Sequence, residues 1–220
     1  MLDPKKLFDN GAHYGHVKKL WKAENKDYIY GDSNGIHIID LFKTVKLAEN
    51  AKTFIDKLKK KDSEILVVCT KGHIKESVVD LIKDKDLIHF VDSRWLGGTL
   101  TNWITLRSRI VAMQQLEKKL NDESIELSKK DRLKLNKDLA EMKRNFAGIE
   151  NMKELPKAII VLDGVRDKYA VNEARAMRIP SVVLVDSNTT SKNVDYPVPL
   201  NDDSLGAVLE VSKYLLESYL

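Results

Sequence analysis

The stretch AIIVLDGVRDKYAVNEARAMRIPSVVLVD, residues 158–186, decides the fold class. Its two ends, AIIVL and SVVLV, are apolar almost throughout, which is typical of strands that are buried on both faces of a parallel sheet. Between them, Ala170, Ala174 and Met177 recur at the three-to-four spacing of one helix face. A buried strand, a helix and a second buried strand in this order predict a β-α-β unit.

The same alternation extends toward the amino terminus. Further strands are predicted at residues 36–40, 64–69 and 87–91, and helices separate them. The apolar faces of those helices are Leu41, Val45, Ala48, Ala51, Ile55 and Leu58 in the first, and Ile74, Val78, Leu81 and Ile82 in the second. A last helix is expected to begin near residues 202–204, whose side chains suit N-capping. The whole pattern predicts an α/β fold with a doubly wound parallel sheet.

Residues 101–148 interrupt this alternation with two amphipathic segments. Heptad-like spacing relates Trp103, Leu106, Ile110, Met113 and Leu120 in the first segment, and Leu135, Leu139, Met142 and Phe146 in the second. A polar turn separates them, with Ser128 and Asp131 placed as a capping box for the second helix. We expect an inserted antiparallel coiled-coil hairpin that projects from a sheet domain formed by residues 1–100 and 149–220.

The composition narrows the class of protein. The 220 residues are 43% hydrophobic, which suffices for a buried core, and no apolar run reaches the roughly 20 residues of a membrane helix. The amino terminus lacks the apolar stretch of a secretory signal, and a single cysteine, Cys69, excludes an intramolecular disulfide framework. We therefore expect a cytoplasmic protein without a membrane-spanning segment, in which Cys69 is a buried thiol.

The formal charge of +4 is distributed unevenly along the chain. Residues 1–62 hold 13 Lys and Arg against 9 Asp and Glu, and residues 101–150 hold 11 against 8, whereas the other two segments are net negative. Between His13 and Tyr30, lysines alternate with aromatic rings. Lysines that bind phosphates and rings that stack on bases are typical of nucleic-acid-binding surfaces. On charge alone, a solvated lysine-rich surface is the better interpretation. With the aromatic rings included, nucleic-acid contact and a solvated surface around core aromatic residues stand as equal alternatives.

The sequence contains no evident catalytic set. Asp92, Asp163 and Asp186 each follow a predicted strand, at the edge where open α/β sheets bind ligands, but aspartates at this position also cap helices and turns. His13 and His16 lack an acidic partner for a metal motif, so we expect packing or hydrogen-bonding roles for their rings and no cofactor. An enzyme or small-molecule binder that uses the three aspartates remains an alternative, as does a protein-binding module whose hairpin engages another helix.

Three blocks of the sequence carry a family resemblance. They are NGAHYGHVKKLW with NGIHIIDLFKT, then VDSRWLGGTLTNW, and then LPKAIIVLDGVRDKYAVNEARAMRIPSVVLVDSN with DYPVPLNDDS. Together they resemble the bacterial-type small-subunit ribosomal protein S2 family over nearly the whole chain. The resemblance implies a flavodoxin-like sheet domain with an inserted coiled-coil hairpin. It also implies a non-enzymatic constituent of the small ribosomal subunit, bacterial or organellar, that acts in translation. Its partners would be ribosomal RNA and neighbouring ribosomal proteins, including the large S1 protein where one exists.

We expect the RNA contacts to come from basic residues in three places. These are Lys18, Lys19 and Lys22 in the amino-terminal segment, Arg94, Arg107 and Arg109 around the start of the hairpin, and Lys129, Lys130 and Arg132 in its second arm. Such residues neutralise phosphates, while the sheet domain acts as a rigid platform. Gly97 and Gly98 are expected to let the chain turn closely before the hairpin, with Thr99 or Thr101 as the cap of its first helix.

Overall fold

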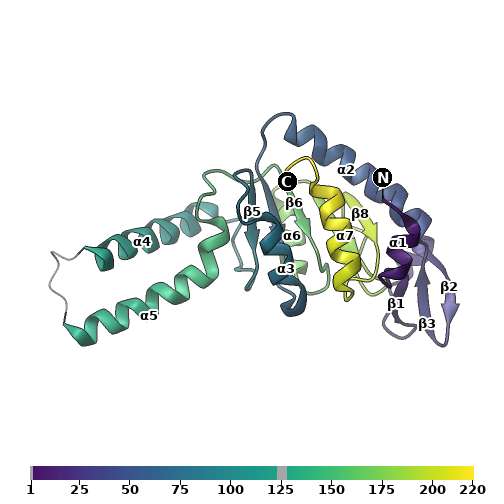
Figure 1. Cartoon of the computed structure of the whole chain (residues 1–220), viewed down its shortest axis with the longest axis horizontal. Helices are drawn as coiled ribbons and strands as arrows, with labels where there is room; N and C mark the ends of the chain where they lie inside the picture. The colour runs from purple at the N-terminus through teal and green to yellow at the C-terminus, as the bar shows by residue number, and fades with distance from the viewer. Residues whose placement is uncertain (1, 123–127) are drawn as a thin grey trace.

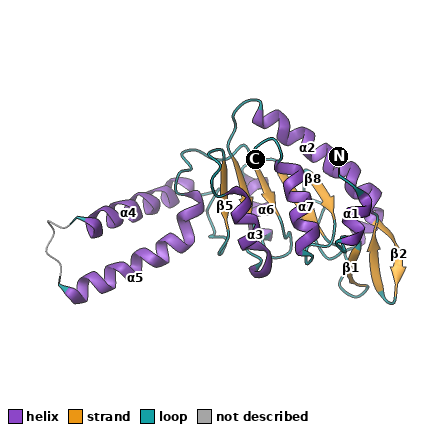
Figure 2. Ribbon diagram, in the orientation of Figure 1, coloured by secondary structure: helices purple, strands orange, loops and turns teal. Residues whose placement is uncertain are grey.

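The computed structural model describes residues 2–122 and 128–220, and its centre is a five-stranded sheet (Figures 1 and 2). The strands are β4 (Ile65–Val68), β5 (Ile88–Val91), β6 (Ala158–Val161), β7 (Ser181–Val185) and β8 (Tyr196–Pro199). They lie in the order β5-β4-β6-β7-β8 and pair in parallel. The order in which successive strands are added to the sheet therefore reverses between β4 and β6, which is consistent with the predicted flavodoxin-like arrangement.

Helices cover both faces of the parallel sheet. They are α1 (Pro4–Asp9), α2 (Leu41–Lys59), α3 (Gly72–Ile82), α4 (Trp103–Asn121), α5 (Lys129–Phe146), α6 (Lys168–Ala176) and α7 (Leu205–Leu216). Ile65 and Val67 of β4 share one core with apolar residues of α1, α2, α3 and α7. Leu66 and Val68 share the other with α6, the first half of α4 and the end of α5. Both sides of each central strand are buried, as its uninterrupted apolar sequence predicts.

The prediction that residues 36–40 belong to the parallel sheet is wrong. β3 (Ile36–Ile39) instead pairs antiparallel with β1 (Tyr14–Val17) and β2 (Ile29–Ser33) in a separate three-stranded sheet. Only alternate residues of β3 are fully buried, so this strand has one core face. Asn34 and Gly35 form the two-residue turn before it, with φ of 51° and 80°. An Asn-Gly pair favours this turn and is the local signal of an antiparallel hairpin.

Strand β8 was not predicted, because its sequence YPVP contains two prolines. A proline has no N–H to donate to a neighbouring strand, so it is tolerated in a sheet only where that side of the strand is free. β8 meets this condition because it is the edge strand and pairs with β7 alone. The prolines also discourage this edge from pairing with another chain.

Helices α4 and α5 run side by side and project from the sheet body at the end opposite to the three-stranded sheet (Figure 1). The predicted capping of α5 by Ser128 is confirmed, because Ser128 Oγ accepts a hydrogen bond of 3.1 Å from the Asp131 N–H. The Asp131 carboxylate accepts a hydrogen bond of 2.7 Å from the Ser128 hydroxyl. Residues 123–127, in the middle of the predicted polar turn, lie outside the described residues. Within the described ranges, no helix combines the length and apolar character needed to cross a membrane.

Two short 3-10 helices complete the chain path. η1 (Ala23–Tyr28) connects β1 to β2, and η2 (Ala147–Ile149) follows α5 and lies against β5. A Cβ atom at Gly148 would be 2.2 Å from the carbonyl oxygen of Phe90 in β5. The close approach of the two backbones therefore requires glycine at this position.

Candidate functional site

Lys71 lies at the carboxyl edge of the parallel sheet and is surrounded by carboxylates. Its Nζ is 2.7 Å from Asp202 Oδ1, 2.7 Å from Asp203 Oδ1 and 3.2 Å from Asp163 Oδ2. Burial alone would lower the pKa of Lys71, but these carboxylates raise it, so the ammonium stays charged. Burial raises the pKa of Asp202 to about 7, with the nearby Asp163 carboxylate adding to the effect. The lysine joins the loops that follow β4, β6 and β8.

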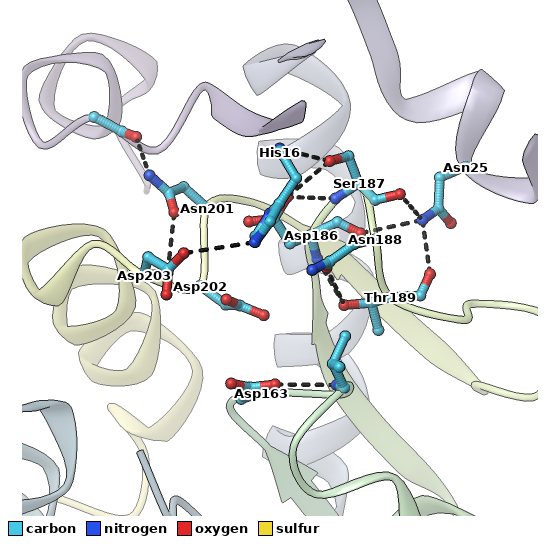
Figure 3. Close-up of polar contacts among 12 residues, drawn as sticks. His16, Asn25, Asp163, Asp186, Ser187, Asn188, Thr189, Asn201, Asp202 and Asp203 are labelled. Atoms are coloured by element: carbon cyan, nitrogen blue, oxygen red, sulfur yellow. Dashed lines mark hydrogen bonds and ion pairs between the residues drawn. The ribbon is translucent and has the colours of Figure 1, made fainter. Parts of the chain in front are cut away.

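The three aspartates singled out in the sequence follow β5, β6 and β7 as predicted, and two of them have structural partners. Asp163 Oδ1 accepts hydrogen bonds from the N–H groups of Val165 (3.0 Å) and Arg166 (2.8 Å), which is the turn-capping alternative. Asp186 faces His16 of the three-stranded sheet (Figure 3). In the part of the chain that the structure describes, no three His, Cys, Asp or Glu residues are grouped so as to hold a metal ion.

Cys69 is buried beside this cluster, as predicted. Burial raises the pKa of its thiol to about 12. The thiolate, which is the nucleophilic form, is therefore almost unpopulated at neutral pH. The packing role expected for the His13 ring is also confirmed, because the ring stacks on Phe8 with centroids 4.2 Å apart.

Polar contacts fasten the three-stranded sheet to the loop after β7 (Figure 3). His16 Nδ1 is 3.2 Å from Asp186 Oδ1, and His16 Nε2 is 3.7 Å from Asp203 Oδ2. The Asp186 carboxylate raises the pKa of His16, although burial opposes the effect. The backbone N–H of His16 donates to Ser187 Oγ at 2.7 Å. A Cβ at Gly15 would be 2.9 Å from the same hydroxyl oxygen, so the contact depends on glycine.

Asn25 in η1 makes a second set of hydrogen bonds to the loop after β7 (Figure 3). Its Nδ2 lies 3.1 Å from the carbonyl oxygen of Asp186, 3.2 Å from that of Ser187 and 2.7 Å from that of Thr189. Its Oδ1 accepts a hydrogen bond of 2.6 Å from Ser191 Oγ. The residue is only 1% exposed, so these groups depend on one another rather than on water. The contacts hold in place the segment that carries the predicted amino-terminal RNA-binding lysines.

The substitution Asn25→Ala is therefore expected to lower the free energy of unfolding by about 2–3 kcal/mol, because it leaves buried carbonyl and hydroxyl groups without a partner. For a chain of this length, the melting temperature would fall by about 4–12 °C in a thermal unfolding experiment. The matched control is Asn136→Ala on the exposed side of α5, which should change the free energy by less than about 0.7 kcal/mol. Equal melting temperatures for the two variants would show that the Asn25 hydrogen bonds contribute nothing to the stability of the fold.

A carboxylate from α6 organises the segment between β5 and α4. Glu173 Oε1 accepts hydrogen bonds from Trp95 Nε1 (3.0 Å) and the Gly98 N–H (2.8 Å). Its Oε2 accepts from the N–H groups of Leu100 (3.0 Å) and Thr101 (3.1 Å), and from the Thr101 hydroxyl (3.1 Å). Burial alone would raise the pKa of Glu173, but these donors lower it. The RWLGGTLTN loop is therefore built around an ionised carboxylate.

The N-cap residue of α4 differs from the one predicted. Asn102 is the N-cap residue and makes no side-chain capping bond, so the expected cap by Thr99 or Thr101 is wrong. The Thr99 hydroxyl donates to the carbonyl oxygen of Leu96 instead. The predicted role of Gly98 is confirmed, because its φ of +91° is one that favours glycine.

The predicted RNA-contacting residues lie at two ends of the molecule and around the start of α4. The amino-terminal lysines lie in the loop between β1 and η1, and the α5 residues lie at the end of α5 that is far from the sheet (Figure 1). Two of the nine have internal partners: Lys18 Nζ is 2.8 Å from Asp32 Oδ2, and the half-buried Arg107 donates to the carbonyl oxygen of Glu150 at 3.0 Å. The side chains that are exposed and make no ion pair within the described residues are Lys19, Lys22, Arg94, Arg109, Lys129, Lys130 and Arg132.

Comparison with known proteins finds matches along nearly the whole chain. The family described as ribosomal protein S2 matches residues 7–220. A protein of Koribacter versatilis named small ribosomal subunit protein uS2 is 37% identical over 205 residues, which cover 93% of this chain and 68% of the relative. A protein of the same name from Acidobacterium capsulatum is 36% identical over 217 residues, which cover 98% of this chain and 72% of the relative.

Proposed function

The chain belongs to the ribosomal protein S2 family, and from this premise we propose how it binds the small ribosomal subunit. The protein is a structural constituent of that subunit in translation, a role that implies association with ribosomal RNA and with neighbouring ribosomal proteins. The family is one of structural rather than enzymatic proteins.

We propose that RNA is bound at two separated places by phosphate contacts. The amino-terminal place uses Lys19 and Lys22, and the hairpin place uses Lys129, Lys130 and Arg132. The observation that carries this proposal is that these five cations are exposed and make no ion pair within the described residues. A cation without an internal partner neutralises a phosphate at no cost in existing contacts. Arg94 and Arg109 add contacts at the hairpin root, whereas Lys18 and Arg107 contribute less because they are already bonded.

We further propose that residues 101–148 form an inserted coiled-coil hairpin, and that residues 1–100 and 149–220 form the domain that carries it. The hairpin carries its RNA contacts away from the sheet domain, and the sheet domain keeps the two RNA-binding places at a fixed separation. The protein also contacts neighbouring ribosomal proteins, among them S1 where the subunit has one. The protein needs no cofactor or small-molecule substrate for this role, and its place in the cell is the ribosome.

The amino-terminal contacts are tested with two variants that differ in the internal pairing of the lysines they replace. Lys19→Gln with Lys22→Gln should reduce the slope of log affinity against log salt concentration by about 1.4–1.8, because each phosphate contact contributes about 0.7–0.9. Lys18→Gln should change the slope by less than about 0.5, because Lys18 is paired with Asp32. The measurement is rebinding to small subunits from cells depleted of this protein. An unchanged slope in the double variant contradicts the amino-terminal contact.

A further inference from the structure

A basic groove lies at the opposite edge of the parallel sheet from the Lys71 cluster, where β7 and β8 begin. It has a volume of about 420 Å³ and is lined by Arg175, Arg178 and Lys192 together with Ile179, Pro180, Asn193, Val194 and Asp195. Three cations therefore face one carboxylate. That carboxylate is already engaged, because Asp195 Oδ2 accepts hydrogen bonds from the Ser181 N–H (2.9 Å) and the Ser181 hydroxyl (3.1 Å).

The three cationic side chains of this groove have no partner within the described residues. They are exposed and make no hydrogen bond or ion pair with any residue in the described ranges. Other cations near the sheet edges are bonded: Lys71 contacts three carboxylates, and Arg166 Nε donates to Thr70 Oγ1 at 2.8 Å. Three unpaired positive charges around one groove create a positive potential that favours binding of a polyanion.

The backbone at Arg178 is a second and independent observation. Helix α6 ends with the Ile179 N–H bonded to the carbonyl oxygen of Ala174 (2.8 Å) and the Arg178 N–H bonded to that of Arg175 (3.1 Å). This pair of bonds is a Schellman motif, in which Arg178 takes the left-handed position that glycine usually fills. Its φ is +56°. The chain thus keeps a strained arginine where glycine would be unstrained, and strain retained in this way points to a use for the side chain.

We infer that this groove binds the phosphate backbone of ribosomal RNA, as a third contact that rests on the proposed function and was not found from the sequence. The guanidinium groups of Arg175 and Arg178 match a phosphate with paired N–H donors, and Lys192 adds a point charge from the loop between β7 and β8. The groove lies at the end of the sheet body away from the carboxyl-edge cluster, so it adds a contact that neither the amino-terminal lysines nor the hairpin makes.

Arg178→Gly separates a role in binding from a role in folding. If the side chain only supported the fold, its removal would lower the melting temperature. We expect the opposite, a rise of about 2–4 °C, because glycine relieves the left-handed strain. The same variant should bind small subunits more weakly and with a salt slope reduced by about 1. Stability and affinity therefore move in opposite directions in one variant. A lower melting temperature, or an affinity equal to that of the wild type, would overturn the inference.

The full test combines Arg175→Gln, Arg178→Gly and Lys192→Gln, and uses small subunits from cells depleted of this protein as the probe. Affinity should fall at least about tenfold near 0.1 M salt, and the salt slope should lessen by about 2–3. A hydroxyl-radical footprint should lose a patch of protected RNA backbone. The charge-matched control replaces the exposed Lys46, Lys60 and Lys213 with glutamine and should keep the wild-type footprint.

The outcomes distinguish this inference from the proposed function. If the wild-type protein does not rebind the depleted subunits, the proposed function itself fails. If the wild type and control rebind and the groove variant matches them, only the groove inference fails. If the groove variant binds weakly but every backbone protection remains, the groove contacts a protein neighbour, and the RNA inference is overturned.

Discussion

Replacing Lys129, Lys130 and Arg132 with glutamate is expected to lower the affinity of the protein for small ribosomal subunits by at least about 100-fold near 0.1 M salt. Each exchange turns an attraction to a phosphate into a repulsion, and a loss of about 1 kcal/mol at each position already gives this factor. The measurement is equilibrium rebinding to subunits from depleted cells. The loss should shrink as salt is added, because the contacts that it removes are those that salt screens.

Because of where Lys129, Lys130 and Arg132 lie, a loss of affinity in the triple glutamate variant cannot be explained by unfolding of α5. Lys129 and Lys130 occupy the first turn of α5, after the Ser128 cap. Acidic residues in the first turn of a helix are favoured by the helix dipole, so the triple glutamate variant should keep or increase its helix content and melting temperature. The control places glutamate at Lys46, Lys60 and Lys213, which gives the same change in net charge elsewhere. If both variants lose affinity equally, the effect is one of total charge, and the hairpin contact is contradicted.

Glu173→Ala is expected to give the largest loss of stability among single substitutions considered for this chain, about 3 kcal/mol. The change removes the acceptor of five hydrogen bonds, three of them from backbone N–H groups of the loop between β5 and α4. A thermal melt should show a fall of about 6–12 °C. The melting temperature of Glu173→Gln should lie between those of Glu173→Ala and the wild type. The amide keeps one oxygen as an acceptor but turns an NH₂ donor toward the remaining N–H groups.

The difference in stability between the wild type and Glu173→Gln should depend on pH, because the pKa of Glu173 is lowered in the folded protein. A depressed pKa means that the carboxylate contributes stability above its unfolded value, near 4.5, and that this contribution is lost as the pH falls through the folded value. The gap in stability between wild type and Glu173→Gln should therefore be constant from pH 6 to 8 and narrow below about pH 4.5. Glu76→Ala, at an exposed position of α3, is the control and should stay within about 0.5 kcal/mol of the wild type. A melting temperature for Glu173→Ala equal to that of this control would refute the role of the carboxylate.

The elements that could be predicted from the sequence are those whose pattern is local. The strands expected at residues 64–69 and 158–162 appear as β4 and β6, shortened by one or two residues, because burial on both faces leaves an unbroken apolar run. The misplaced strand at residues 36–40 has a similar run, but its surroundings are set by the Asn34-Gly35 turn and by pairing with β1 and β2. Apolar sequence therefore identified the strand and not its partners.

The polar contacts of the site could not be predicted, because their partners are distant in the sequence. Asn25 reaches carbonyl groups more than 160 residues away, and Glu173 reaches a loop more than 70 residues before it. Asn25 follows a lysine-rich segment, and Glu173 occupies the polar side of an amphipathic helix, where glutamate usually faces solvent. The left-handed conformation of Arg178 could not be predicted either, because the position at the end of α6 is one that glycine usually occupies.

Sedimentation of the source cell's ribosomes on a sucrose gradient tests the central claim most directly. The account predicts that the protein sediments with small subunits and with whole ribosomes, and that raising the salt concentration releases it into the soluble fractions, because much of its binding is to phosphates. A protein that stays in the soluble pool at low salt and is absent from the small-subunit fractions would contradict the account.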